Sequence, residues 1–398
     1  MPYHAKRFDL DSIIRTLDKV PFSPPFLVIL PVVALFLGNR GQSLNTVLQR
    51  AANLSTWQDL LCVRFRCISY MMLFILIKTV SRFFSLRAEN NYVPQRDPPN
   101  WSQDVVAITG GATGIGKDIV ETLSKKCKAR IAVLDIAEPT YAQAAPGSPP
   151  ILWIQTDVTS ADAIAAAHQK IKEVFGTSPS IVIGCAGIAI GGPLLTTSSG
   201  IVDKTFKINS LQHILLAKEF VPFMAKNNHG HYVTVASSAS YYTPPLLSAY
   251  CMSKAAALAF HEELRVELRV AYNAPRVRTS VVTPTKVRTL LGHALKDTDN
   301  SFIAPTLEPL EVATAITDAI EEGRSHSISQ PMMTKMLPFV RAMPEWYRTF
   351  IAALGKTDGA VTAESIRSGL QAGYGKNWSK EDFDSILGEM AAQYDKSA

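Results

Sequence analysis

The sequence predicts a doubly wound α/β fold, in which helices cover both faces of a parallel sheet, preceded by an apolar N-terminal region. Three observations support this prediction. From residue 104 onward, short apolar runs alternate with longer helical segments, a pattern typical of parallel sheets. A glycine-rich turn joins the first of these runs to the first helix. The first hundred residues differ in character, because they contain two long apolar segments.

The apolar runs from residue 104 onward are expected to be buried strands, and the segments between them helices. The expected strands are residues 104–109, 130–135, 151–155, 180–184, 231–237, 276–282 and 326–329. The expected helices are residues 115–126, 161–175, 201–226, 248–270 and 307–322. Together these elements place a catalytic domain at residues 101–332.

Residues 1–100 are predicted to associate with a membrane through apolar segments at about 22–38 and 67–80. A spanning helix needs about 20 apolar residues, and three prolines in the first segment (Pro24, Pro25 and Pro31) bend or interrupt a helix. Two spans, a shallow hairpin in one leaflet, and one span with an interfacial helix all stay open. A helical subdomain packed on the core is the remaining alternative. Residues 90–102, rich in Pro and Asn, form the linker at the domain boundary.

Residues 333–398 form an amphipathic C-terminal extension. Its aromatic part, residues 333–354, is a lid over the substrate, a surface-lying membrane contact or an ordinary core helix. A further helix is expected from Ser379, because Asp382 completes a capping signal.

Composition excludes several classes of function. The net charge of +6 is spread along the chain without a lysine or arginine block, so no nucleic-acid partner is expected. The five cysteines form no C-x-x-C pair and no zinc spacing, which indicates reduced thiols and no metal site.

The glycine-rich turn indicates a dinucleotide. Gly110, Gly114 and Gly116 lie between a strand and a helix, where glycines let backbone N–H groups approach a pyrophosphate at the helix N-terminus. Asp135 ends the next strand and is placed to accept hydrogen bonds from a ribose 2′-hydroxyl. Its charge would repel a 2′-phosphate, so NAD(H) is favoured, although NADP(H) is not excluded. Asp157 is placed either to contact the adenine or to cap a helix.

Tyr250 and Lys254 project from one face of an alanine-rich helix. A phenol titrates near 10, so acid–base chemistry at neutral pH requires its pKa to fall by about 3 units. A neighbouring ammonium group supplies part of that shift.

These motifs, in this order, resemble the short-chain dehydrogenase/reductase family over residues 103–330. The branch that they most resemble contains membrane-associated retinol and 17β-hydroxysteroid dehydrogenases. The positions that carry the resemblance are Thr109, Gly110, Gly114, Ile115, Gly116, Asp157, Val158, Cys185, Ala186, Gly187, Asn209, Ser237, Tyr250 and Lys254.

The resemblance implies a Rossmann-type domain whose general acid/base is Tyr250. Lys254 would lower the pKa of Tyr250 and hold the nicotinamide ribose. Ser237, or Ser238 in another loop register, would bind the reacting oxygen. Asn209 would kink its helix and hold a water that relays protons to Lys254.

The same resemblance places the cofactor against Thr109, Gly110, Gly114, Ile115, Gly116, Asp135, Asp157, Val158, Ala186, Gly187, Asn209, Tyr250, Lys254, Val287 and Thr289. Two positions depart from the family pattern. Cys185 stands where an asparagine that braces the sheet is common, and Thr285 stands where a glycine commonly follows the sixth strand.

The predicted function is hydride transfer between NAD(P)(H) and the carbinol or carbonyl carbon of a lipophilic retinoid, steroid or long-chain lipid. The substrate would come from a membrane or lipid-droplet surface. The predicted location is the endoplasmic reticulum or a lipid droplet, with the catalytic domain facing the cytosol. A homodimer on the Tyr250 helix is common in the family and stays open. The alternatives are a non-catalytic dinucleotide-binding scaffold at a membrane and a soluble reductase with a folded N-terminal extension.

Overall fold

A computed structural model describes residues 9–140, 144–195, 197–296, 302, 305–354 and 361–362 of the chain. It divides into two compact units, Leu10–Ala88 and a catalytic unit that begins at Glu89. The helix expected from Ser379 lies outside the described residues.

The catalytic unit is built on a seven-stranded parallel sheet with the order β3-β2-β1-β4-β5-β6-β7. The strand order reverses direction beside β1, as in doubly wound sheets that bind nucleotides at this point. The predicted fold class is therefore confirmed. The strands are β1 Val105–Thr109, β2 Arg130–Asp135, β3 Leu152–Gln155, β4 Ile181–Gly184, β5 His231–Val235, β6 Arg278–Pro284 and β7 Ser327–Gln330.

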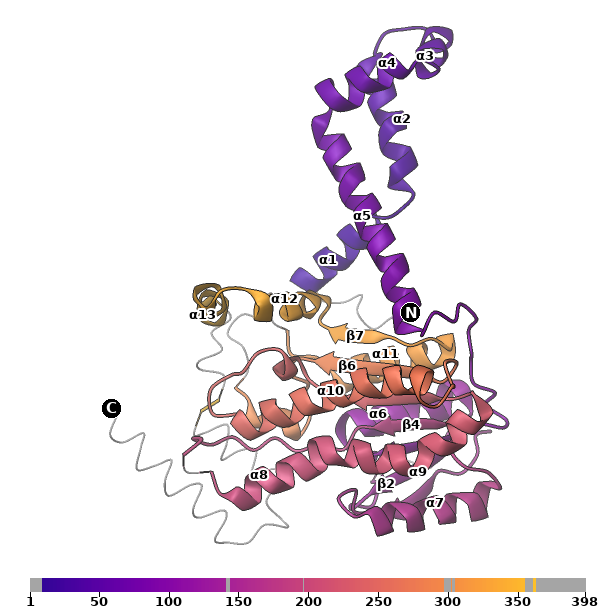
Figure 1. Ribbon diagram of the computed structural model, residues 1–398, viewed down its shortest axis with the longest axis vertical. Coiled ribbons are helices and arrows are strands. Elements are labelled where there is room, and N and C mark those ends of the chain that lie inside the picture. The colour runs from indigo at the N-terminus through magenta and orange to yellow at the C-terminus, as the bar shows by residue number, and fades with distance from the viewer. Residues whose placement is uncertain are drawn as a thin grey trace. The chain divides into compact units, whose positions relative to one another are not determined.

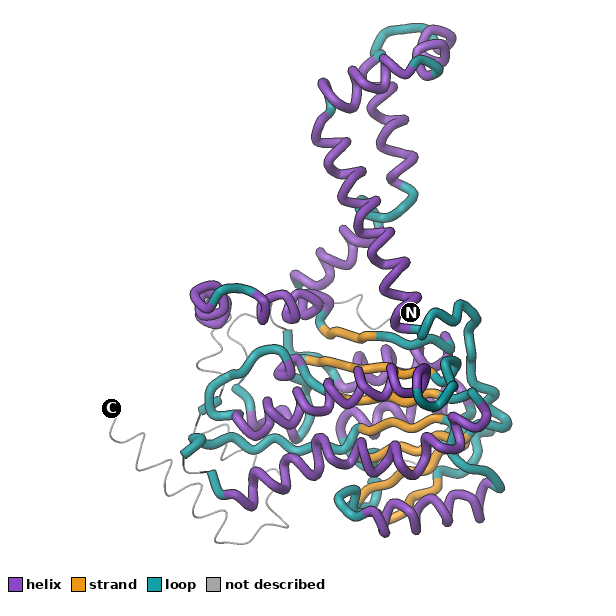
Figure 2. The backbone as a smooth tube through the Cα atoms, viewed as in Figure 1, coloured by secondary structure: helices purple, strands orange, loops and turns teal. Residues whose placement is uncertain are grey.

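Helices cover both faces of this sheet (Figures 1 and 2). Alternate residues of β1 point to opposite faces: Val106 and Ile108 join the core cluster with α6 and α11, whereas Val105 and Ala107 join the cluster with α7, α9 and α10. The helices are α6 Gly114–Thr122, α7 Ala161–Phe175, α8 Ser199–Phe206, α9 Gln212–Asn227, α10 Ser248–Val270, α11 Pro309–Glu322, α12 Leu337–Ala342 and α13 Glu345–Leu354.

The helix expected at residues 201–226 differs most from its prediction. A π-helical turn, Lys207–Leu211, divides it into α8 and α9. The expected helix 307–322 begins at Pro309, because Glu308 and Glu311 form a capping box before it. The strand expected at 276–282 begins and ends two residues later, at Arg278–Pro284.

The segment expected as a linker, residues 90–102, is packed on the catalytic unit. The fully buried Arg278 donates hydrogen bonds to the carbonyl oxygens of Asn90 and, at 2.5 Å, Gln95. The Asn90 side chain accepts from Ser325 N at 2.8 Å. These contacts explain why the two units divide at Glu89 and not at residue 100.

The unit Leu10–Ala88 is entirely helical between its turns. Its helices are α1 Leu10–Lys19, α2 Phe26–Gly38, α3 Leu44–Ala51, α4 Leu54–Trp57, a π-helical segment Gln58–Arg64, and α5 Arg66–Glu89. Pro31 lies inside α2. Within the described residues, α5 is the one helix long and apolar enough to cross a membrane, and 6% of its apolar window is buried.

Candidate active site

The glycine turn after β1 leaves no room for side chains. Gly110 has a φ of +66°, and a Cβ there would lie 2.7 Å from Ala186 Cα. A Cβ on Gly116 would lie 2.1 Å from the Gly110 carbonyl oxygen. α6 begins at Gly114, and the Thr113 side chain makes no capping hydrogen bond to its first N–H groups. Ile115 packs on the core cluster below. The turn therefore fits a pyrophosphate at a helix N-terminus.

The loop after β6 reaches this glycine turn. A Cβ on Gly114 would lie 3.2 Å from the Thr289 methyl carbon. The Thr289 hydroxyl accepts a hydrogen bond from Gly292 N at 3.2 Å. Val287 pairs with Leu307 in a β-bridge, which holds the loop in place. Val287 and Thr289, far from the glycines in sequence, thus lie at one site with them.

Asp135 ends β2, and Asp157 follows β3 by two residues. The Asp135 carboxylate accepts from Ala112 N at 2.9 Å and Ala137 N at 3.0 Å, which ties it to the glycine turn. Asp157 instead accepts from the backbone N and hydroxyl of Thr159. The N-cap of α7 is Ser160, so the capping alternative for Asp157 is wrong. Val158, next to it, is buried.

Asn209 lies fully buried in the π-helical turn and holds the loop after β4. Its Oδ1 accepts from Ile188 N at 2.8 Å, and its Nδ2 donates to Ile188 O at 2.8 Å and Ser253 Oγ at 3.0 Å. Both amide protons are thus used, and one lone pair on Oδ1 is left to accept from a water. A Cβ on Gly187 would lie 3.3 Å from this Oδ1 and 3.4 Å from Lys254 Nζ. Asn209, Gly187 and Lys254 therefore meet at one point.

Tyr250 and Ser237 meet at the carboxyl edge of the sheet. Ser237 lies next to Tyr250 and acts to lower the pKa of that phenol, whereas Ser238 acts in the same way on Tyr242. The Ser237 hydroxyl also accepts from Ala239 N at 3.1 Å. Of the two serines considered, Ser237 is the one in contact with Tyr250.

The ionisation of Tyr250 differs from the expectation. Burial raises the pKa of Tyr250 to about 12, and the hydrogen bond from Ser237 offsets only part of that rise. Lys254 donates to the Val235 carbonyl oxygen at 2.8 Å, and burial lowers the pKa of Lys254 to about 8. Desolvation thus outweighs the expected attraction between ammonium and phenolate. The phenol is protonated at neutral pH and is set up to donate a proton.

A family profile described as short chain dehydrogenase matches residues 104–300. Dehydrogenase RED2 of Cochliobolus heterostrophus is 34% identical over 206 residues, covering 52% of this chain and 76% of that protein. Estradiol 17-beta-dehydrogenase 11 of Homo sapiens is 32% identical over 267 residues, covering 66% of this chain and 85% of that protein.

The chain is a short-chain dehydrogenase/reductase. It is an NAD(P)-dependent dehydrogenase that acts on CH–OH groups, close to the 17β-hydroxysteroid dehydrogenase branch. A crystal structure of a family member from Burkholderia phymatum, solved in complex with NAD, has the same fold. It is 24% identical, covers 60% of this chain and 93% of that one, and has a TM-score of 0.52.

Gln212 was missed by sequence reasoning. In this short-chain dehydrogenase it is fully buried, its Oε1 accepts from the Thr109 hydroxyl at 3.1 Å, and its Nε2 donates to Ala186 O at 2.7 Å. Thr109 Oγ1 in turn accepts from the backbone N of Cys185 and of Ala186. We call this Thr109–Gln212 pair the clasp. It fixes the loop that packs on Gly110, at the place where Cys185 replaces the common asparagine. No motif in the sequence links Gln212 to Thr109 or Ala186.

Cys185 and Thr285 are the two departures from the family pattern. Cys185 has a free thiol whose pKa burial raises to about 12, so the thiol is neutral. Thr285 N donates to Gln330 O at 2.9 Å, and the Thr285 hydroxyl is buried without a partner among the described residues.

Apolar side chains surround Tyr250. One buried cluster contains Tyr250 and residues from the loop after β4, from α8 and from the segment that leads into α10. Its buried members are Ala189, Ile190, Ile201, Ala239, Leu247, Tyr250, Cys251 and Val361. The Tyr250 side chain thus packs among apolar side chains.

Proposed function

We propose that the protein is a membrane-associated, NAD(H)-dependent oxidoreductase that interconverts a lipophilic alcohol with its ketone or aldehyde. The observation that carries this proposal is the contact of Tyr250 with Ser237 inside an apolar cluster. An apolar wall favours retinoid, steroid or long-chain lipid substrates over polar metabolites. The apolar unit Leu10–Ala88 supports delivery from the endoplasmic reticulum membrane or a lipid droplet.

The proposed proton chemistry follows from the protonated phenol. In the reductive direction Tyr250 donates its proton to the carbonyl oxygen, which Ser237 holds by a hydrogen bond. In the oxidative direction the phenol first passes its own proton through the water at Asn209 toward Lys254, and the resulting phenolate then takes the hydroxyl proton of the substrate. Bound nicotinamide supplies or accepts the hydride at the adjacent carbon.

The remaining polar groups position the cofactor and route the proton. Lys254, beside Gly187, is placed to hold the nicotinamide ribose, and the free lone pair of Asn209 Oδ1 is placed to accept from a water on the way to Lys254. The glycine turn would hold the pyrophosphate, and Asp135 the adenosine ribose.

Turnover by the full chain in lipid vesicles tests this proposal. Retinal, a steroid ketone and a long-chain aldehyde are each offered with NADH. Replacement of Tyr250 by Phe is expected to lower kcat by about 10²- to 10⁴-fold, with NADH binding preserved. Tyr272→Phe is the matched control, because Tyr272 lies exposed just beyond α10. Full turnover in Tyr250→Phe would contradict the mechanism, whereas dinucleotide binding without turnover in the unchanged chain would favour a non-catalytic dinucleotide-binding scaffold.

A further inference from the structure

The last described helices of the chain form an arm at the carboxyl edge of the sheet. β7 ends at Gln330, a short 3₁₀ turn follows, and α12 and α13 then occupy Leu337–Leu354. We call residues 337–354 the C-terminal arm. In Figure 1 it runs beyond the end of β7, outside the helices that cover the sheet. Ligands of doubly wound sheets bind outside the carboxyl ends of the strands, so the arm lies at the edge where the substrate would arrive.

The arm has no buried residue in α12, and α13 has none among its described side chains, although Tyr347, Ile351 and Ala352 are half-buried. An ordinary core helix, one of the three interpretations of this stretch, is therefore wrong for its described part. The exposed side chains are large and apolar, and Trp346 and Phe350 lie one turn apart on the same face of α13. The exposed fractions are 60% for Phe339, 45% for Met343, 71% for Trp346 and 57% for Phe350.

The exposed aromatic and basic side chains of the arm favour a lipid surface as its partner. Arg341 and Arg348 oppose a single acidic residue, Glu345, with which Arg348 is paired. An exposed helix with aromatic side chains and an excess of basic ones is typical of helices that lie in the headgroup layer of a membrane.

We propose that the C-terminal arm lies in the headgroup region of a lipid membrane and holds the active-site edge against it. This inference rests on the membrane location in the proposed function and adds a second, independent membrane contact. Arg341 donates to Ser240 O at 3.1 Å, so the arm is tied to the turn that begins at the catalytic Ser237. A lipophilic substrate then passes from lipid to Tyr250 without crossing bulk water.

Other exposed apolar residues at the same edge support this orientation. Leu194 and Leu195, in the loop after β4, are 66% and 92% exposed, and Leu290, after β6, is 43% exposed. Loops that follow strands of a parallel sheet all lie at its carboxyl edge. Exposed leucines on two such loops are costly in water and favourable against lipid.

Quenching of tryptophan fluorescence tests the proposed contact. The full chain is placed in vesicles of phosphatidylcholine and phosphatidylserine that contain brominated phosphatidylcholine. The spectrum of Trp346→Phe, subtracted from that of the unchanged chain, isolates the Trp346 emission. Bromolipid is expected to quench this component at least about twofold. Trp153, in β3, is the matched control, and the component isolated with Trp153→Phe should be unaffected. An unquenched Trp346 overturns the proposal, and this readout does not depend on turnover.

Kinetics distinguish the membrane contact from a lid. In the double variant Trp346→Ser/Phe350→Ser, the apparent KM for a vesicle-borne ketone is expected to rise about tenfold, a loss of ~1.4 kcal/mol in effective affinity. The kcat/KM for a short water-soluble ketone should not change, because the arm is then not needed.

An equal loss on both substrates would show a lid and overturn the proposal. A changed oligomeric state with unchanged vesicle kinetics would show an interface between copies and also overturn it. Absence of turnover in the unchanged chain would contradict the proposed function and leave the quenching result standing.

Discussion

Asp135 is the residue that we propose selects between the two dinucleotides. Both its oxygens accept backbone N–H groups, and its charge faces the position expected for the adenosine ribose. We predict that Asp135→Asn, which keeps an acceptor for Ala112 N and removes the charge, shifts the NADPH/NADH ratio of kcat/KM toward NADPH by about 10- to 100-fold, or ~1.4–2.8 kcal/mol. Steady-state kinetics with both cofactors measure this ratio. An unchanged ratio would mean that charge at this position does not select the cofactor.

Gln212 is expected to contribute both to stability and to NADH binding. Gln212→Met keeps the size of the side chain but leaves the Thr109 hydroxyl and the Ala186 carbonyl without their partner, at a cost of about 1–3 kcal/mol. The loop that packs on Gly110 then loosens, so both the melting temperature and the affinity for NADH should fall. The control is Gln103→Met, in the turn before β1. Equal melting temperatures with unchanged NADH affinity would show that the clasp does not position the cofactor loop.

The sequence could predict some residues of the site but not others. Gly110, Gly116 and Asp135 belong to one strand–turn–helix–strand unit, so local spacing was enough to place them together. The clasp could not be predicted, because it joins β1, the loop after β4 and the start of α9, and no motif links these segments. The raised pKa of Tyr250 was also missed, since it comes from burial by side chains distant in sequence.

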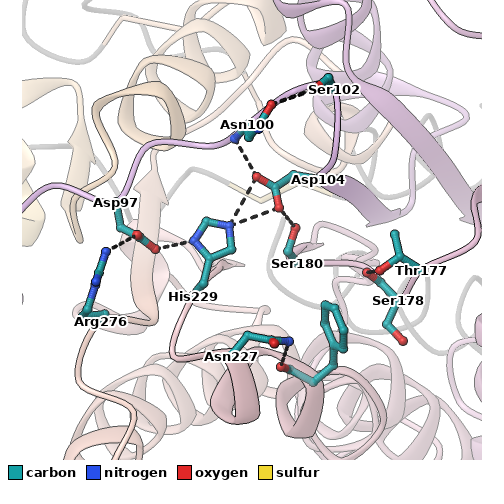
Figure 3. A network of polar contacts seen from close by, with 11 residues as sticks. Asp97, Asn100, Ser102, Asp104, Thr177, Ser178, Ser180, Asn227, His229 and Arg276 are labelled. Atoms are coloured by element: carbon teal, nitrogen blue, oxygen red, sulfur yellow. Dashed lines mark hydrogen bonds and ion pairs between the residues drawn. The ribbon is translucent and has the colours of Figure 1, made fainter.

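At the scale of elements, the amino-terminal edge of the sheet is held by a charged network around His229 (Figure 3). His229 contacts Asp97 at 2.6 Å and Asp104 at 3.1 Å, and Arg276 donates to Asp97 at 2.9 Å. The hydrogen bonds with Asp104 and then Asp97 raise the pKa of His229 to about 10. Burial, the largest single effect, would raise the pKa values of both aspartates, but the hydrogen bonds and charge of His229 together with Arg276 at Asp97 and Ser180 at Asp104 outweigh it and lower them. The network joins the segment before β1 to the turns before β5 and β6.

This network makes the stability of the catalytic unit depend on pH. The folded pKa of His229 exceeds its ordinary value of 6.5, so its contribution is complete below about pH 6.5 and is lost as pH rises through about 10. The aspartate contributions are present above their ordinary pKa and are lost as pH falls below it. We predict that His229→Gln costs about 1–3 kcal/mol at pH 5–6.5 and progressively less toward pH 10.

Melting temperatures of the two proteins across pH 5–10 measure this difference. Arg276→Gln is the matched control: the guanidinium stays charged over this whole range, so its smaller cost should be constant. A His229→Gln cost that does not vary with pH would contradict the raised pKa.

The division of the long helix into α8 and α9 belongs to the same scale. Residues 201–226 are continuous in helical pattern, and sequence alone predicted one helix. The family resemblance implied a kink at Asn209, and the structure has a π-helical turn there, in which Asn209 reaches Ile188 and Ser253. Helix 248–270, in contrast, was predicted to its last residue, because no long-range contact interrupts its period.

At the scale of the whole molecule, the chain combines a polar-surfaced catalytic unit with an apolar helical one. Within Leu10–Ala88, α2 and α5 expose large apolar side chains on most of their surfaces. The one lysine in the middle of α5, Lys78, is paired with Asp18 and donates to Phe22 O at 2.8 Å. Pairing of this kind lowers the cost of a charge placed near lipid. The exposed leucine and phenylalanine side chains of α5, together with a lysine whose charge is paired, favour hydrocarbon surroundings over water for this helix.

α5 is expected to be the main membrane anchor in the unit Leu10–Ala88. A helix of 24 residues such as α5 is ~36 Å long and exceeds the ~30 Å hydrocarbon core, whereas the 13 residues of α2 reach only ~20 Å. We therefore expect α5 to supply most of the anchoring, and the full chain to stay in the membrane pellet after carbonate extraction. Replacing Leu73, Phe74 and Ile77 by Asp should release it, since each aspartate costs roughly 2.5–3.5 kcal/mol within a membrane. Val174→Asp with Val270→Asp, at exposed apolar positions of the catalytic unit, is the control and should leave the protein in the pellet. Release of the unchanged chain by carbonate would show that Leu10–Ala88 is a folded extension of a soluble reductase, because protein that is not inserted in lipid cannot resist alkaline extraction.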